Sequence, residues 1–189
     1  MIVETEQPCV TCLCNEPEGA ILREIRQMVL TPENVYKFWE KSRHHPTLFS
    51  AEIRNNFEKF LQLFLRDGPD GAVSQGLFWV MDDMVGLFYM TDIQLMVDCQ
   101  VHYTFFDGRH HGRVDITREM LRYGFSTFGF RRMTTTVPLY AYPALKFAEQ
   151  VGFKQEGRKR AAALYKNKWF DVRYFGILKE EANRNGRIT

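Results

Sequence analysis

The chain has 189 residues, of which 45% are hydrophobic and 25% charged, a balance typical of a globular protein with one sizeable core. Its formal net charge of +2 is too small for the strong basic field that bulk nucleic-acid binding requires. No apolar stretch approaches the roughly 20 residues that span a bilayer, and the N-terminus has no signal-peptide pattern. We therefore expect a cytoplasmic protein that binds neither nucleic acid nor membrane.

The first 18 residues contain three cysteines, two prolines and several acids, and they predict an irregular lead-in. Cys9, Cys12 and Cys14 form a C-x-x-C-x-C cluster. One interpretation is a zinc site of three thiolates that Cys99 or a histidine completes; the other is a set of reduced thiols without metal. Because a second C-x-x-C pair is missing, we expect no metal site.

A first strand is expected over residues 20–30. The segment 31–33 then begins a helix, because threonine is an N-cap residue, proline suits the first helical position and an acid suits the first turn. A second helix is expected to begin at Ser50 and to end at the turn 67–71. The inner faces of these two helices are expected to contain Val35, Phe38, Trp39, Ile53, Phe57, Phe60, Leu61 and Phe64.

Strands dominate the middle of the chain and alternate with helices after it. The expected order is strands at 76–81, 85–91 and 96–106, a helix at about 112–128, a strand at 133–137, a helix at 143–151 and a hairpin of 158–165 with 169–178. Gly152 is a natural residue to end the second of these helices. The inner face of the first is expected to contain Val114, Thr117, Leu121, Phe125 and Phe128. This order predicts an α/β (α+β) domain in which a mixed sheet has helices on both faces.

A basic, glycine-containing turn lies between the strand ending near residue 106 and the helix that follows. The first amides of a helix have no intrahelical acceptor and the helix dipole favours negative charge there, so such a turn can bind phosphate. Gly112 has no Cβ to block a close approach, and Arg109 or Arg113 can add charge-assisted hydrogen bonds. A tight turn that binds nothing has the same pattern, so both interpretations are open.

Three segments have the pattern of a known family. They are 109–114 (RHHGRV), against a Q/R-x-x-G-x-G/A pyrophosphate loop, 144–153 (ALKFAEQVGF) and 169–180 (WFDVRYFGILKE). With the element order, they resemble the GNAT superfamily of acyl-CoA-dependent N-acyltransferases, and within it the branch of ribosomal-protein N-terminal acetyltransferases. The resemblance covers about residues 20–181.

The resemblance implies a splayed sheet of about seven strands with about four helices, in a domain over 19–181 between the lead-in (1–18) and a C-terminal tail (182–189). It implies acetyl-CoA as co-substrate, with the pantetheine arm between the diverging strands 96–106 and 133–137. The pyrophosphate would bind at Arg109, His110, His111, Gly112, Arg113 and Val114. The acceptor would be an amine of a protein N-terminus, a lysine or a small molecule.

The resemblance also implies a base for the ammonium proton and an acid for the leaving thiolate. His102 and Asp98 precede the loop, and His102 is the better candidate because imidazole titrates near neutrality. A structural histidine in the sheet is the simpler interpretation of the same residue. Tyr142, or Tyr140, is the candidate acid. The pair His44–His45, near the family's acceptor groove, is interpreted as part of a solvated turn.

Four positions depart from the family pattern. They are Val114 for a small residue, Ala141 for asparagine, Ala144 for serine and Ala148 for tyrosine. These replacements leave a second hypothesis open, a catalytically inactive protein of the same fold that acts as an interaction or assembly component. Such a protein could form a homo-oligomer or belong to a virion.

Overall fold

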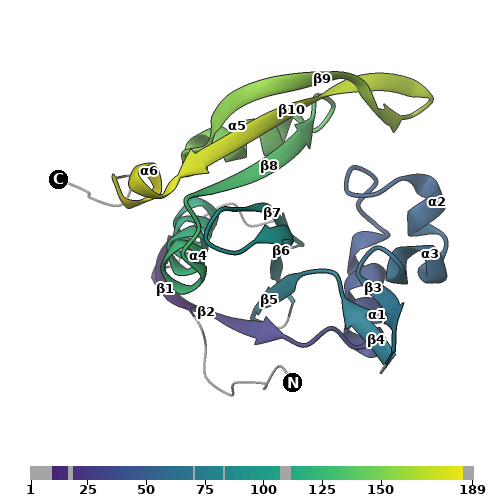
Figure 1. The fold of residues 1–189 in the computed structure, drawn as a ribbon, viewed down its shortest axis with the longest axis horizontal. Coiled ribbons are helices and arrows are strands. Elements are labelled where there is room, and N and C mark those ends of the chain that lie inside the picture. The colour runs from purple at the N-terminus through teal and green to yellow at the C-terminus, as the bar shows by residue number, and fades with distance from the viewer. Residues whose placement is uncertain (1–9, 17–18, 70, 83, 107–111, 185–189) are drawn as a thin grey trace.

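The computed structural model describes residues 10–16, 19–69, 71–82, 84–106 and 112–184. Eight strands form one sheet, in the spatial order β1 (Val10–Glu16), β2 (Gly19–Met28), β5 (Leu77–Met81), β6 (Gly86–Gln94), β7 (Asp98–Phe105), β8 (Arg132–Pro138), β10 (Lys168–Leu178) and β9 (Lys154–Tyr165) (Figure 1). Neighbouring strands are antiparallel except for β7 and β8, which are parallel. A separate two-stranded ribbon contains β3 (Leu65–Gly68) and β4 (Gly71–Ser74).

Helices cover both faces of this sheet. In the described residues they are α1 (Pro32–Ser42), α2 (Ala51–Arg54), α3 (Phe57–Leu61), α4 (Arg113–Phe128), α5 (Tyr142–Val151) and α6 (Lys179–Arg184). None of them is both long enough and apolar enough to cross a membrane. Phe78 and Trp79 are adjacent on β5 and fully buried, but they enter opposite cores because alternate side chains of a strand point to opposite faces. The predicted mixed α/β fold is confirmed.

The predicted helix boundaries at residues 31 and 152 are confirmed by their capping geometry. Thr31 Oγ1 accepts a hydrogen bond from the Asn34 amide at 3.2 Å, and Pro32 is the first residue of α1. Gly152 ends α5 with φ at 117°, a conformation that costs glycine little. The expected inner-face residues Val35 and Phe38 are buried.

The helix predicted from Ser50 is instead two short helices, α2 and α3. Ser50 caps α2, and the Asn56 side chain accepts a hydrogen bond from the Lys59 amide at 2.9 Å, which begins α3. Asparagine bonds to nearby backbone in this way more readily than it continues a helix. Phe60 is nevertheless buried, as its spacing predicts.

Both ends of the chain are more regular than expected. The prediction of an irregular lead-in is wrong for residues 10–16, because β1 pairs along its whole length with β2 and adds an eighth strand to the predicted seven. The strand begins with the β-branched residues Val10 and Thr11, which favour a strand. At the other end, α6 extends into the predicted tail as far as Arg184, and Ala182 is buried.

β7 and β8 meet at one point and then diverge, as the family resemblance implies. Their backbone pairing is confined to Gln100 and Thr134, and Gln100 Nε2 also donates to Thr136 Oγ1 at 3.1 Å. Beyond this point β7 continues to pair with β6, while β8 pairs with β10 up to Pro138. In Figure 1 the β8–β10–β9 layer therefore stands away from β5, β6 and β7. The sheet is splayed.

Candidate active site

α4 begins where the sequence predicts a helix, directly after Gly112. Gly112 is the N-cap residue with φ at 71° and ψ at −10°, in the left-handed region that glycine adopts at little cost. Its carbonyl accepts the first helical hydrogen bond, from the Ile116 amide at 3.0 Å. The Arg113 guanidinium lies 4.9 Å from the centre of the Phe105 ring. Of the predicted phosphate-binding residues, Gly112, Arg113 and Val114 are in place here, and Arg109, His110 and His111 lie outside the described residues.

A cavity of about 510 Å³, called here the interstrand cavity, lies beside the splayed end of β7. This volume is within the usual range for a cofactor or ligand site. Its walls come from the end of β7, the start of α4, the inner side of α5 and the loop after α1. The lining residues are His45, Thr47, Leu48, Tyr103, Thr104, Phe105, Arg113, Val114, Pro143, Ala144, Lys146, Phe147 and Gln150.

The charged side chains that line the interstrand cavity are all positive among the described residues. Arg113 and Lys146 are cations, and no described lining residue is a carboxylate. The remaining walls are mainly aromatic and aliphatic, with Tyr103 and Phe105 facing Phe147 at ring-centre distances of 5.0 Å and 5.8 Å. An elongated, partly apolar ligand with anionic groups fits such a cavity.

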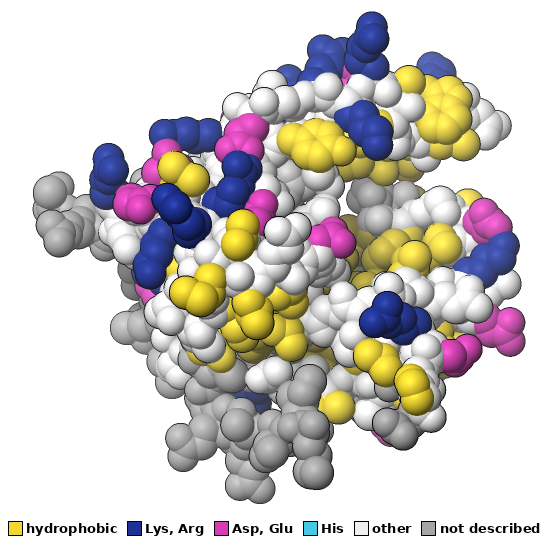
Figure 2. Space-filling view, viewed as in Figure 1, with side chains coloured by type: hydrophobic (Ala, Val, Ile, Leu, Met, Phe, Trp, Pro, Cys, Tyr) yellow, Lys and Arg dark blue, Asp and Glu magenta, His cyan; other side chains and the backbone are white. Residues whose placement is uncertain are grey.

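A second cavity of about 430 Å³, called here the hairpin groove, lies between residues 46–54 and the tip of the β9–β10 hairpin. Figure 2 shows the surface hollowed between the hairpin and the α1–α3 region. Tyr140 and Tyr165 stack in its wall, with ring centres 4.4 Å apart. Its acid, Glu52, is paired with Lys59, and this pairing lowers the pKa of Glu52. The lining also contains Arg54 and Lys166, so the groove has no net negative character.

Asp171 stabilises a bulge in the β9–β10 hairpin. Three residues of β9 stand opposite this one residue of β10, and Ala161 has φ at 47°, which is uncommon for a residue with a side chain. Asp171 Oδ1 accepts the Ala161 amide at 2.8 Å, and Oδ2 accepts Arg158 Nε. These two donors, the amide first, lower the pKa of Asp171. The carboxylate therefore fixes the direction in which the hairpin tip leaves the sheet.

His102, the predicted base, lies in the sheet rather than on the cavity wall. Its Nε2 is 3.0 Å from Thr91 Oγ1, and its ring stacks on Tyr89 with centres 4.4 Å apart. Burial lowers the pKa of His102 to about 4, although the charge of Asp92 opposes the shift. A proton acceptor with so low a pKa is weak at neutral pH. This environment favours the interpretation of His102 as a structural residue of the sheet.

Asp98 and Tyr142, the other predicted catalytic residues, are not brought together with His102. Asp98 begins β7 at the closed side of the splay and pairs with Arg132 at 3.4 Å. Burial raises the pKa of Asp98, and Arg132 opposes that shift. His102 is four positions along the strand from Asp98, about 13 Å away. Tyr142 is 60% exposed at the start of α5, where Lys146 Nζ lies 4.9 Å from its ring centre, and it is not among the lining residues.

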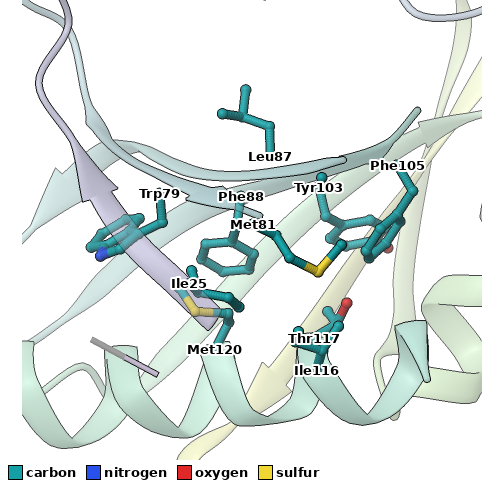
Figure 3. Close-up of a pocket in the computed structure, with 11 residues that line it drawn as sticks. Ile25, Trp79, Met81, Leu87, Phe88, Tyr103, Phe105, Ile116, Thr117 and Met120 are labelled. Atoms are coloured by element: carbon teal, nitrogen blue, oxygen red, sulfur yellow. The ribbon is translucent and has the colours of Figure 1, made fainter. Parts of the chain in front are cut away.

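A third cavity lies inside the larger core and is too small for a substrate. Its volume is about 20 Å³, enough for one water molecule. Figure 3 shows Trp79, Phe88 and Tyr103 of the sheet facing Ile116 and Met120 of α4 around it. We therefore interpret it as a packing defect of the core.

Of the four cysteines, Cys99 is the one whose side chain the structure describes. Cys12 and Cys14 lie on β1, although their side chains are outside the described part, as is the whole of Cys9. Cys99, the proposed fourth ligand, is a free thiol buried in the main core, and burial raises its pKa to about 12. Cys99 packs among the apolar side chains of the main core, so its thiol does not face a shared ligand site in the described residues. The described residues contain no group of three or more potential ligands.

Tyr103 and His45 line the interstrand cavity and have ionisable side chains, although the sequence did not indicate either as a site residue. Tyr103 was part of the expected strand, but nothing local indicated that its hydroxyl would be buried without a hydrogen-bond partner among the described residues. Burial raises the pKa of this hydroxyl. His45 was interpreted as part of a solvated turn, yet its imidazole lines the interstrand cavity. Its approach to β7 depends on how α1 packs on the sheet, for which the sequence has no local signal.

Comparisons with known proteins agree with this geometry. No protein-family model matches the chain. An uncharacterized N-acetyltransferase, YokL, derived from the SPbeta prophage of Bacillus subtilis strain 168, is 30% identical over 66 residues, which span 35% of the chain and 37% of that relative. RimJ of Mycobacterium smegmatis, in complex with CoA-disulfide, has a TM-score of 0.66 at 16% identity over 95% of each chain. Dodecameric spermidine N-acetyltransferase of Vibrio cholerae has a TM-score of 0.65 at 14% identity, covering 87% of this chain and 98% of that one.

These similarities extend over nearly the whole of each solved structure. At identities this low, the likeness establishes the architecture. The chain has the fold of the GNAT N-acetyltransferases.

Proposed function

We propose that the protein is an N-acetyltransferase that transfers an acetyl group from acetyl-CoA to an amine. The observation that carries the proposal is the interstrand cavity, which opens beside the splay, has two cations and has no carboxylate among its described lining residues. Structurally similar proteins include one bound to CoA-disulfide and one named for spermidine acetylation. The curated relative is also an N-acetyltransferase by name. None of these similarities supports the viral alternative.

The chain's own residues suit each part of acetyl-CoA. The N-terminus of α4, with Gly112 and Arg113, suits the pyrophosphate, because the positive end of the helix dipole and a guanidinium both attract anions. Beyond Gln100, β7 pairs with β6 on one side and has no described strand partner on the other. Its free main-chain groups there can bond the amides of the pantetheine arm. The ring of Phe147 supplies an apolar wall for the arm.

Acetyl transfer then requires a neutral amine beside the thioester. The hairpin groove is the proposed acceptor site, because it lies on the α1–α2 side, and its wall at Pro46 is next in sequence to His45 of the interstrand cavity. The amine nitrogen attacks the carbonyl carbon, the carbon–sulfur bond breaks, and CoA leaves as its thiol. Holding both reactants in adjoining cavities supplies much of the rate enhancement. A protein N-terminus, a lysine or a small amine could occupy the groove.

The replacements that suggested an inactive protein leave the cavity open. Ala144 lines it without closing it, and Ala148 is fully buried in the core, away from any acceptor. Val114 forms part of the wall and packs against the core. The base role therefore falls to another residue.

A turnover assay tests the proposal. Release of the CoA thiol is measured with acetyl-CoA and either an N-terminal peptide or a small primary amine. Ala144→Trp would fill the cavity and is expected to abolish release, whereas Glu149→Trp, exposed on the same helix and not lining the cavity, is the matched control. Equal turnover in the two variants, or wild-type protein that acetylates no amine of any class, would contradict the proposal.

A further inference from the structure

One imidazole lies where the two cavities approach each other. Among the described residues that line the interstrand cavity, His45 is the one histidine, and the next residue, Pro46, lines the hairpin groove. The side chain is half-buried. A group at this position can reach an amine that enters from the groove toward a thioester in the cavity.

The backbone holds His45 firmly at this point. Its amide donates to the Ser42 carbonyl at 2.9 Å, and its carbonyl accepts the Leu48 amide at 3.1 Å. Ser42 is itself buried at the end of α1, where its hydroxyl donates to the Phe38 carbonyl at 2.8 Å. The turn is thus an extension of a helix that is packed in the core. These hydrogen bonds fix the backbone of His45 and leave its ring nitrogens free of them.

The ring itself is available for proton transfer. It lies 5.6 Å, centre to centre, from the Phe106 ring, and neither nitrogen has a hydrogen-bond partner among the described residues. The His102 ring differs, because its Nε2 lies 3.0 Å from Thr91 Oγ1 and desolvation lowers its pKa. Histidine is the side chain that exchanges protons most readily near neutral pH. The described lining of both cavities has one carboxylate, Glu52, and it is paired with Lys59.

We propose that His45 is the general base of the acetyl transfer, an inference that rests on the proposed function. The imidazole takes one proton from the acceptor ammonium and leaves a neutral amine. The amine nitrogen forms a bond to the carbonyl carbon as the carbon–sulfur bond breaks. The second amine proton goes to the departing thiolate, which gives the thiol of CoA, and the imidazolium returns its proton to solvent.

The adjacent histidine pair offers a matched test. His45→Gln removes the base, and His44→Gln removes an exposed imidazole that lines neither cavity. For both variants and the wild type, kcat and kcat/KM are measured between about pH 5.5 and about pH 9.5, a range that brackets imidazole titration. Calorimetric titration with acetyl-CoA and the melting temperature report whether binding and folding are intact.

The His45→Gln variant is expected to lose about 100-fold or more in kcat at neutral pH, the usual contribution of a general base. Its acid limb in the pH profile should shift toward the pKa of the acceptor amine, while its affinity for acetyl-CoA stays within about twofold. His44→Gln should match the wild type. A wild-type pH profile and kcat in His45→Gln would overturn the role of His45 alone. Wild-type protein that neither binds acetyl-CoA nor acetylates an amine would overturn the proposed function and this inference with it.

Discussion

The half-buried imidazole of His102 predicts a specific dependence of stability on pH. Its pKa is lowered from 6.5 to about 4, chiefly because burial disfavours the charged form. The unfolded chain therefore binds a proton at this residue below about pH 6.5, while the folded chain does so only below about pH 4. Stability is thus lost as the pH falls through this window. A shift of about 2.5 pKa units corresponds to about 3 kcal/mol.

Comparison with His102→Gln isolates this contribution from those of the carboxylates. The amide side chain can still reach Thr91 but does not titrate, so its cost to stability should be the same at every pH. Urea unfolding of the two proteins is measured at intervals from about pH 7 to about pH 4. The free energy of unfolding of the wild type should fall by about 3 kcal/mol more than that of the variant over this range. Parallel curves would refute the description of His102 as a half-buried, neutral residue of the sheet.

Three further predictions concern the hairpin, the glycines and the acceptor. Asp171→Ala should speed hydrogen exchange of the Ala161 amide and raise KM for the acceptor more than for acetyl-CoA, whereas Asp171→Asn keeps an acceptor oxygen and should change both less. Gly76→Ala should destabilise the protein by about 1–3 kcal/mol in urea unfolding, because the new Cβ would lie 2.2 Å from the Met90 backbone oxygen; Gly176→Ala meets only a movable carboxylate and should cost less. In competition assays a polyamine should be a poorer acceptor than a peptide α-amine, since the hairpin groove has one carboxylate and it is already paired; a preference for the polyamine would refute this view of the groove.

Local patterns in the sequence were enough for much of the fold. The cap at Thr31, the terminal glycine at 152 and the turn at Gly112 each depend on a few neighbouring residues, and all three have the expected geometry. The splay between β7 and β8 followed from the family resemblance. The pairing of strands that are distant in the chain was harder to predict from the sequence. β1 was missed because its regularity depends on the partner strand β2, which the local composition does not reveal.

In the candidate site, too, local patterns were less informative than contacts between distant segments. His102 was a reasonable base from its position before the loop, but its environment is set by Tyr89 and Thr91 on the neighbouring strand. His45 was passed over because a histidine pair before a proline has the pattern of an exposed turn. What brings it to the interstrand cavity is the packing of α1, through Phe38, on the far side of the sheet from α4. Such long-range packing decides which titratable residues face a cavity.

Calorimetric titration of the wild-type protein with acetyl-CoA tests the central claim, that the splay between β7 and β8 receives an acyl-CoA, most directly. We predict binding at a single site per chain, lost in Ala144→Trp and retained in Glu149→Trp. Absence of binding heat at millimolar acetyl-CoA, or equal affinity in both variants, would contradict it.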